Sequence, residues 1–374
     1  MENLTIQQIS GERELKEFIR LPHKLHKNHV NWVPPIYSEE KSYFNPNKNH
    51  GYKYCSTVEV FARIDGEIVG RIMGIINHRY NEARNEKTAR FSHFDCINNP
   101  AVSARLLEFV EKWATERGMD KIIGPMGMYY HNPIGFLTDG FNEKPSFSAN
   151  FNFDYIIPFL QSAGYTSEAD LVEYEVKIPE EFPEYYRKIK ERALNGKKLQ
   201  IANISKKKHI GNYILPVLNL MNETYKDILG YSQLDEEEMH EVAGEFIPLL
   251  DPKLLVIAEY ENEIAGFIIA IPSLNEGIIA AKGRLFPFGF LKIMKAAKRT
   301  KQLDLLLGAV KPRFQGLGID AVMGIHLMEK AREMGFQTID SHLELESNLK
   351  VRAEMEKMGG TILKKYRVFK KELK

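Results

Sequence analysis

The stretch AVKPRFQGLGID, residues 309–320, is the part of this sequence that decides the fold. It follows a strand-like run over 305–310 and leads into a helical pattern that begins at Ile319. Backbone N–H groups at a helix N-terminus bind phosphate, and small residues let a ligand approach the backbone closely. A strand, a glycine-containing loop and a helix in this order therefore indicate a site for a phosphorylated ligand, although purely structural turns share the pattern.

The composition is typical of a globular protein, and the first residues lack the apolar core of a signal peptide, so we expect no targeting segment. The chain has 374 residues, 44% of them hydrophobic and 27% charged, with a net charge of +1. A charge near zero gives no general attraction to nucleic acid. No window has the length of a membrane span, and Cys55 and Cys96 lack metal-ligand spacing. We therefore expect a cytoplasmic protein with no nucleic-acid partner and no metal.

The two halves of the sequence repeat one order of elements. Hairpins are expected over 56–77 and 254–273, turning at 65–66 and 261–262, and each precedes a strand and then a helix that ends at a glycine. The segment EIVG at 67–70 matches EIAG at 263–266, at an offset of 196 residues. Matching Ala, Glu, Gly and Ile residues later in each half are 217 residues apart.

This repeat predicts two mixed α/β units in tandem. The first unit spans 1–178 and the second spans 199–374, and the Pro- and charge-rich segment 179–198 is the expected linker. The offsets differ by 21 residues, which predicts an insertion at 280–302 in the second unit.

The loop at 309–320 is similar to a known family motif. Hairpin, strand, loop, helix, strand and a second helix closed by EKMGG is the element order of the GNAT acyltransferase superfamily, which the chain resembles. The family loop, Val-x-Pro-x-Tyr-Arg/Gln-x-x-Gly-x-Gly/Ala, is met in register by Val310, Pro312, Phe314, Gln315 and Gly318. A later family motif fits Asn348 and Gly359. The resemblance implies an α/β fold of two GNAT-like units whose second copy binds acetyl-CoA or another acyl-CoA.

The resemblance also implies the cofactor-binding residues. Loop amides would hold the pyrophosphate, and the strand before the loop would leave backbone groups for the pantetheine arm. The positions concerned are Gly308, Ala309, Val310, Gln315, Gly316, Leu317, Gly318, Ile319 and Asn348. The corresponding segment of the first copy, CINNP at 96–100, has no glycine, and Pro100 removes an amide. We therefore expect the first copy to be degenerate and to bind no cofactor.

Two positions depart from the family pattern. Asp320 replaces the final Gly or Ala of the loop, and a carboxylate beside a pyrophosphate is unfavourable unless it points away. Met355 lies where many family members carry a tyrosine that protonates the leaving thiolate, and a thioether donates no proton. By elimination, Tyr366 or an ordered water is the candidate donor, although a packed strand aromatic is the alternative interpretation of Tyr366.

A general base is expected on the strand at 337–347. Strict alternation would place Asp340, His342, Glu344 and Glu346 on one face, and we choose Glu344 as the candidate. The alternative is a polar edge that faces solvent.

Two further segments have unusual compositions. The segment GPMGMYYHNPIGFLTDGF at 124–141 is expected to form a substrate wall through Tyr129, Tyr130, His131 and Asn132, or else to pack the two copies together.

In RLFPFGFLKIMKAAKRT at 284–300, aromatic residues precede a basic helical face. We expect its aromatics to pack against the first copy with Lys292, Lys295 and Arg299 in solvent; a lid over an acyl chain and a membrane-surface helix are the alternatives.

These features predict an acyl-CoA-dependent N-acyltransferase, most simply an acetyltransferase, that acts on a small-molecule or peptide amine between the two copies. A non-catalytic acyl-CoA-binding or structural protein is the main alternative, favoured by Asp320 and Met355. A peptidyl-transfer relative that uses charged tRNA is a third, against which the near-zero net charge argues.

Overall fold

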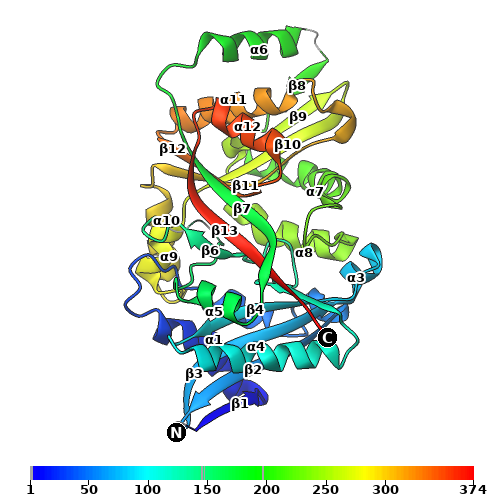
Figure 1. Ribbon diagram of the computed structural model, residues 1–374. Helices are drawn as coiled ribbons and strands as arrows, with labels where there is room; N and C mark the ends of the chain where they lie inside the picture. Colours follow the sequence, from blue (N-terminus) through cyan, green and yellow to red (C-terminus); the bar gives the residue numbers. More distant parts are fainter. Residues whose placement is uncertain (1–2, 145, 147, 196–197) are drawn as a thin grey trace.

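The computed structural model describes residues 3–144, 146, 148–195 and 198–374 (Figure 1). One continuous mixed sheet runs through the molecule in the order β1-β2-β3-β4-β5-β13-β7-β12-β11-β10-β9-β8, and β6 pairs with β13 beside this path. Helices cover both faces of the sheet, as the predicted α/β class requires. Among the described residues, no helix is both long and apolar enough to cross a membrane.

Within its described residues, the first half of the chain contributes seven strands. They are β1 (Leu4–Gln8), β2 (Cys55–Ile64), β3 (Glu67–Asn77), β4 (Thr88–Cys96), β5 (Lys121–Gly124), β6 (Phe136–Asp139) and β7 (Thr166–Lys177). The helices of this half are α1 (Gly11–Leu25), α2 (Tyr37–Tyr43), the 3₁₀ turn η1 (His50–Lys53), α3 (His78–Arg84), α4 (Pro100–Thr115) and α5 (Ile156–Ser162).

The second half repeats this order. Its strands are β8 (Leu199–Ile201), β9 (Leu255–Tyr260), β10 (Glu263–Pro272), β11 (Gln302–Val310), β12 (Thr338–Leu345) and β13 (Thr361–Glu372). Its α-helices are α6 (Glu184–Asn195), α7 (Gly211–Tyr225), α8 (Glu236–Phe246), α9 (Asn275–Ala281), α10 (Gly289–Ala297), α11 (Ile319–Glu333) and α12 (Leu349–Lys357). Its 3₁₀ turns are η2 (Lys207–His209), η3 (Ile247–Leu249), η4 (Pro252–Leu254) and η5 (Pro312–Phe314).

The predicted hairpins form because of their turn residues. Asp65 and Gly66 join β2 to β3 with φ values of 48° and 87°, and Glu261 and Asn262 join β9 to β10 with 51° and 65°. Two central residues with positive φ define the turn whose twist matches that of the flanking strands. Between the third and fourth strands of each half lies α3 in one copy and α9 with α10 in the other.

The two halves exchange their last strands. β7 ends the first half but pairs with β12 of the second, while β13 ends the chain and pairs with β5 of the first. β7 and β13 also pair with each other, and Figure 1 shows them side by side through the middle of the molecule. The sheet therefore does not divide at the predicted boundaries of 178 and 199. The expected linker contains α6, which packs against α11.

A buried ion pair lies between the exchanged strands. Lys364 of β13 and Glu173 of β7 are cross-strand partners, both side chains are inaccessible to solvent, and they form an ion pair. The Lys364 Nζ also donates to the Ser146 hydroxyl at 2.9 Å, and that hydroxyl donates to Glu173. A charge in such a place is tolerated only because its partner is present.

We predict that Lys364→Met destabilises the fold by about 3–5 kcal/mol, since it leaves the Glu173 carboxylate buried without its counter-ion. The double variant Lys364→Met/Glu173→Leu should recover most of this loss, because no buried charge is left unpaired. Urea unfolding of the three proteins provides the test. A single variant as stable as the parent would show that the ion pair does not contribute to holding the exchanged strands.

Candidate active site

A single cavity of about 1610 Å³ joins the loop at 315–320 to the first half of the molecule. It passes between β11 and β12, runs along the segment 129–134, and reaches the loop at 32–36 and α9. Ligand pockets are typically about 300–1000 Å³, so this cavity has room for more than one small ligand. Its walls contain apolar residues of both halves, among them Trp32, Phe151, Tyr225, Leu306 and Met355.

The predicted phosphate-binding loop lies at one end of this cavity. Gly316 and Gly318 have φ values of 81° and 75°, which favour glycine, and Gly318 is the N-cap of α11. Gln315, Gly316 and Asp320 line the cavity, whereas the Leu317 side chain is exposed and that of Ile319 is buried in the core. Asn348, the predicted partner from the next helix, caps α12 and also lines the cavity.

Asp320 reduces the number of free amides in this loop. Its carboxylate accepts a hydrogen bond from the Ala321 amide at 2.9 Å, within the first turn of α11. Burial and the neighbouring Asp320 raise the pKa of Glu354 on α12 to about 8. At neutral pH Glu354 is therefore mostly protonated, and the pair carries about one negative charge. The sequence indicated the unfavourable carboxylate but not Glu354, because only the packing of α12 beside α11 brings the two together.

β11 and β12 separate as the resemblance implied. The two strands pair in parallel only over 302–304 and 338–340, and the cavity occupies the gap beyond. Within this gap the Tyr225 hydroxyl donates to the Gly308 carbonyl at 2.9 Å and accepts from the Gly308 amide at 3.2 Å. The Gln315 amide group donates to the Val310 carbonyl at 3.4 Å. The backbone groups of Gly308 are thus not open to a ligand, contrary to the prediction, unless Tyr225 moves.

Tyr225 was not found from the sequence. It is the last residue of α7, and its ring packs edge-to-face against Tyr130 and Tyr231. The sequence around Tyr225 does not predict its contact with Gly308, because the two residues lie 83 positions apart in the chain.

A bulge in β12 changes which residues share a face. Asp340 and Leu343 oppose Glu175 and Glu173 of β7, so two residues of β12 face one residue of β7, and His342 has a φ of 59°. Glu344 opposes Val172, on the other face from Asp340. The prediction that Asp340, His342, Glu344 and Glu346 share one face is therefore wrong, because it assumed unbroken alternation.

Glu344 nevertheless lies in the cavity. It lines the gap between β11 and β12, and burial raises the pKa of Glu344 to about 7. Its charge in turn raises the pKa of the Tyr130 and Tyr225 hydroxyls, together with their burial. A carboxylate whose pKa is near neutrality is suited to accept a proton.

Tyr366 lies within the sheet rather than on the cavity wall. Its side chain is 1% exposed, it packs in the core around Leu137 and Val368, and its hydroxyl has no hydrogen-bond partner among the described residues. This placement does not favour the proton-donor role predicted for it. Met355, by contrast, lines the cavity.

The comparisons with known proteins concern the whole chain. No family model matches it. It is 26% identical to a protein named bacterial ceramide synthase from Caulobacter vibrioides, over 99% of this chain and 98% of that protein. It is also 26% identical to protein YghO of Escherichia coli K12, over 97% and 94%.

Solved structures share the fold at low identity. A tandem GNAT protein from the clavulanic acid biosynthesis pathway superposes with a TM-score of 0.56 at 11% identity, covering 100% of this chain and 99% of that one. A GCN5-related N-acetyltransferase from Sphaerobacter thermophilus gives 0.55 at 10% identity, covering 99% and 96%. The chain has a tandem GNAT fold. The predicted fold class is thereby confirmed.

The first copy of the tandem GNAT fold has no counterpart of the loop at 315–320. The Asn99 side chain accepts from the Ala101 amide at 3.0 Å and so uses an amide at the start of α4. Residues 96–100 do not line the cavity. These observations agree with a degenerate first copy.

The first copy of the tandem GNAT fold instead supplies a wall. Tyr129, Tyr130, His131 and Asn132 all line the cavity. The same segment packs between the halves, since Tyr130 contacts Tyr225 and the Tyr129 hydroxyl donates to Asn49 at 2.6 Å. The segment 124–141 thus both lines the cavity and packs between the two halves.

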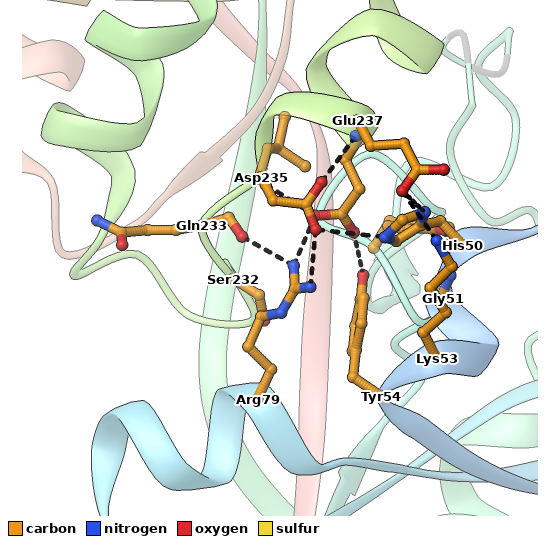
Figure 2. Close-up of polar contacts among 12 residues, drawn as sticks. His50, Gly51, Lys53, Tyr54, Arg79, Ser232, Gln233, Asp235 and Glu237 are labelled. Carbon is orange, nitrogen blue, oxygen red and sulfur yellow. Dashed lines mark hydrogen bonds and ion pairs between the residues drawn. The ribbon is translucent and has the colours of Figure 1, made fainter.

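A polar cluster ties the two copies of the tandem GNAT fold together (Figure 2). His50 Nε2 lies 3.2 Å from Asp235, which caps α8, and Lys53 pairs with Glu237 at 2.9 Å. Arg79 pairs with Asp235 at 3.2 Å and with the buried Glu238. The side chains of His50, Asp235 and Glu238 converge closely enough to hold a metal ion, but Arg79 already pairs with both carboxylates. We therefore assign the cluster an electrostatic role between the halves.

We predict that CoA binding to this tandem GNAT fold weakens as pH rises through about 8. The pKa of Glu354 is raised, so deprotonation above pH 8 adds negative charge beside the loop that would face the CoA phosphates. Calorimetric titration of CoA should show a loss of affinity of about threefold to tenfold between pH 7 and pH 9.

The variant Glu354→Gln should remove this pH dependence, while Glu356→Gln on the same helix should retain it. The same slope in Glu354→Gln and the parent would contradict the assignment.

Proposed function

We propose that this protein is an N-acyltransferase that moves a long acyl chain from acyl-CoA to the amine of a long-chain acceptor. The single observation that carries the proposal is the continuity of the cavity from the glycine loop at 315–320, through the gap between β11 and β12, to apolar walls in the first half. The CoA phosphates would lie against the loop amides and the thioester would lie in the gap. An acetyl group would fill little of the remaining space, so we favour long chains over the acetyl transfer expected from the sequence.

The name of one relative supports the same substrate class. A ceramide is an amide between a fatty acid and a long-chain amino alcohol, so a ceramide synthase joins two apolar chains at one nitrogen. The protein of that name matches this chain over nearly its whole length, at 26% identity. A volume of about 1610 Å³ lined by apolar residues of both halves is consistent with two such chains.

The residues in the gap suggest the roles of acid and base. As the amine nitrogen attacks the thioester carbonyl, its proton passes to the Glu344 carboxylate. The bond between carbonyl carbon and sulfur breaks, and the thiolate takes the proton of the Tyr225 hydroxyl. Glu344 then returns a proton to Tyr225. Both side chains line the cavity, whereas Met355 has no proton to donate and Tyr366 lies in the sheet core.

We predict turnover with palmitoyl-CoA and sphinganine, a long-chain amino alcohol, measured as released CoA thiol and as amide by mass spectrometry. The acidic limb of kcat/KM should rise through about pH 7, because Glu344 must lose its proton to act as a base. Glu344→Gln should lower kcat by about 10²-fold or more and abolish this limb. An amide product that forms equally well in Glu344→Gln would contradict the role of Glu344.

We further predict that Tyr225→Phe lowers kcat by about 10²-fold while acyl-CoA still binds. The substitution removes one hydroxyl and frees the backbone groups of Gly308 for the ligand. Tyr366→Phe is the matched control, since it removes a hydroxyl that has no partner in the core. Loss of turnover in Tyr366→Phe with normal turnover in Tyr225→Phe would reverse the assignment.

A non-catalytic acyl-CoA-binding protein is the second candidate. It is favoured by the hydrogen bond of Asp320 to an amide that phosphate would otherwise use, and by Met355 in place of a proton donor. Stoichiometric acyl-CoA binding without thioester cleavage, across a panel of long-chain and short-chain amines, would establish this alternative.

A further inference from the structure

The loop between α9 and α10 carries large apolar side chains into solvent. Phe286 is 79% exposed and Phe288 is 67% exposed, and Phe290, Leu291 and Met294 at the start of α10 are also exposed. The expectation that these aromatics pack against the first copy is therefore wrong for Phe286 and Phe288. Five large apolar side chains within nine residues form a contiguous apolar surface, which soluble proteins rarely present without a partner.

The same segment is strongly basic. Residues 277–303 contain no aspartate or glutamate and seven lysines and arginines: Lys282, Arg284, Lys292, Lys295, Lys298, Arg299 and Lys301. The whole chain has a net charge of only +1, so this local excess is a property of the segment alone. It favours a partner that is negatively charged.

α10 arranges these residues as an interfacial helix does. An α-helix turns by about 100° per residue, so within α10 Phe290, Leu291 and Met294 lie on one side and Lys292 and Lys295 lie on the adjacent side. Arg299 follows in the turn after the helix. The third side packs on α9, where Gly277 approaches the backbone of Ile293 and the side chain of Ala296 closely. The apolar side and the basic side are therefore both outside the protein core, next to each other.

This surface is one helix away from the cavity. Asn275 and Ile278 of α9 line the cavity, as do Pro34 and Pro35 of the first half. The Tyr37 amide donates to the Gly283 carbonyl at 3.0 Å, which fixes the start of the aromatic loop against that wall. Figure 1 shows α9 and α10 together at the side of the molecule. An apolar ligand that left a bilayer at this surface would have a short path to the cavity wall.

We propose that the loop at 284–288 and the outer side of α10 dock the protein on an anionic lipid bilayer. Phe286 and Phe288 enter the boundary between headgroups and acyl chains, and the flanking lysines and arginines contact anionic headgroups. Association is peripheral and reversible. This association places the protein at the bilayer, where long apolar chains are dissolved. It does not depend on the chemistry proposed for the cavity.

The test is co-sedimentation of the full chain with vesicles of phosphatidylcholine alone and of phosphatidylcholine mixed with phosphatidylglycerol. Binding should require the anionic lipid and weaken as salt is raised. The double variant Phe286→Ser/Phe288→Ser should bind at least about tenfold more weakly than the parent. The triple variant Lys292→Gln/Lys295→Gln/Arg299→Gln should lose binding to the same extent. Ile362→Ser removes an apolar side chain of β13 that is 40% exposed and lies outside the docking segment, and it should bind as the parent does.

Three outcomes would overturn the proposal. They are equal binding to neutral and anionic vesicles, unchanged binding of the phenylalanine variant, and a dimer in light scattering that this variant converts to a monomer. The last would mean that a second copy covers the surface. Because the measurement is binding rather than turnover, its failure would leave the proposed acyl transfer standing, and a failure of acyl transfer would leave the docking surface standing.

Discussion

The pairing of β7 with β13 is the constraint on which the rest of the structure depends. Each half of the chain ends in a long strand that completes the sheet of the other half, so the halves cannot separate without breaking the sheet. The buried pair of Lys364 and Glu173 ties these strands at a point where neither charge reaches water. A cavity between two domains would ordinarily change with their motion. Here both halves are joined in one sheet, and the segment 129–132 lines the same cavity as the gap between β11 and β12 of the other copy.

That fixed gap explains how a degenerate copy can still contribute to a site. Residues 96–100 of the first half contain no glycine, yet its aromatic segment at 129–132 encloses the space into which β11 and β12 open. Enclosure lowers the local dielectric, which raises the pKa of Glu344 to about 7. At physiological pH the protonated and ionised forms of its carboxyl group are therefore both populated. Tyr225 fills the backbone positions at Gly308 that a ligand would otherwise use. Binding of acyl-CoA in the gap would therefore exchange one set of hydrogen bonds for another.

The sequence predicted those features that depend on local chemistry. Asp65 and Gly66 predicted a hairpin turn because both positions need positive φ. The glycines at 316 and 318 predicted the loop because small residues before a helix let a ligand approach the backbone. The strand exchange could not be predicted, because a strand's alternation does not identify its neighbour in the sheet. The bulge at His342 places Glu344 on the opposite face of β12 from the one predicted, and the residue types around it do not predict a bulge. Phe286 and Phe288 were expected to be buried because they are apolar, and their exposure became apparent only from the packing of α9 and α10.

The central claim is that acyl-CoA enters the gap between β11 and β12 by displacing the Tyr225 hydroxyl from Gly308. The most direct measurement is a structure of the protein with a bound, unreactive thioether analogue of palmitoyl-CoA. The account predicts the pyrophosphate at the amides of 315–320, the pantetheine arm on the backbone of Gly308, the acyl chain along the segment 129–134, and Tyr225 turned away from its present partners. An analogue bound elsewhere, or bound in the gap with Tyr225 still on Gly308, would contradict it.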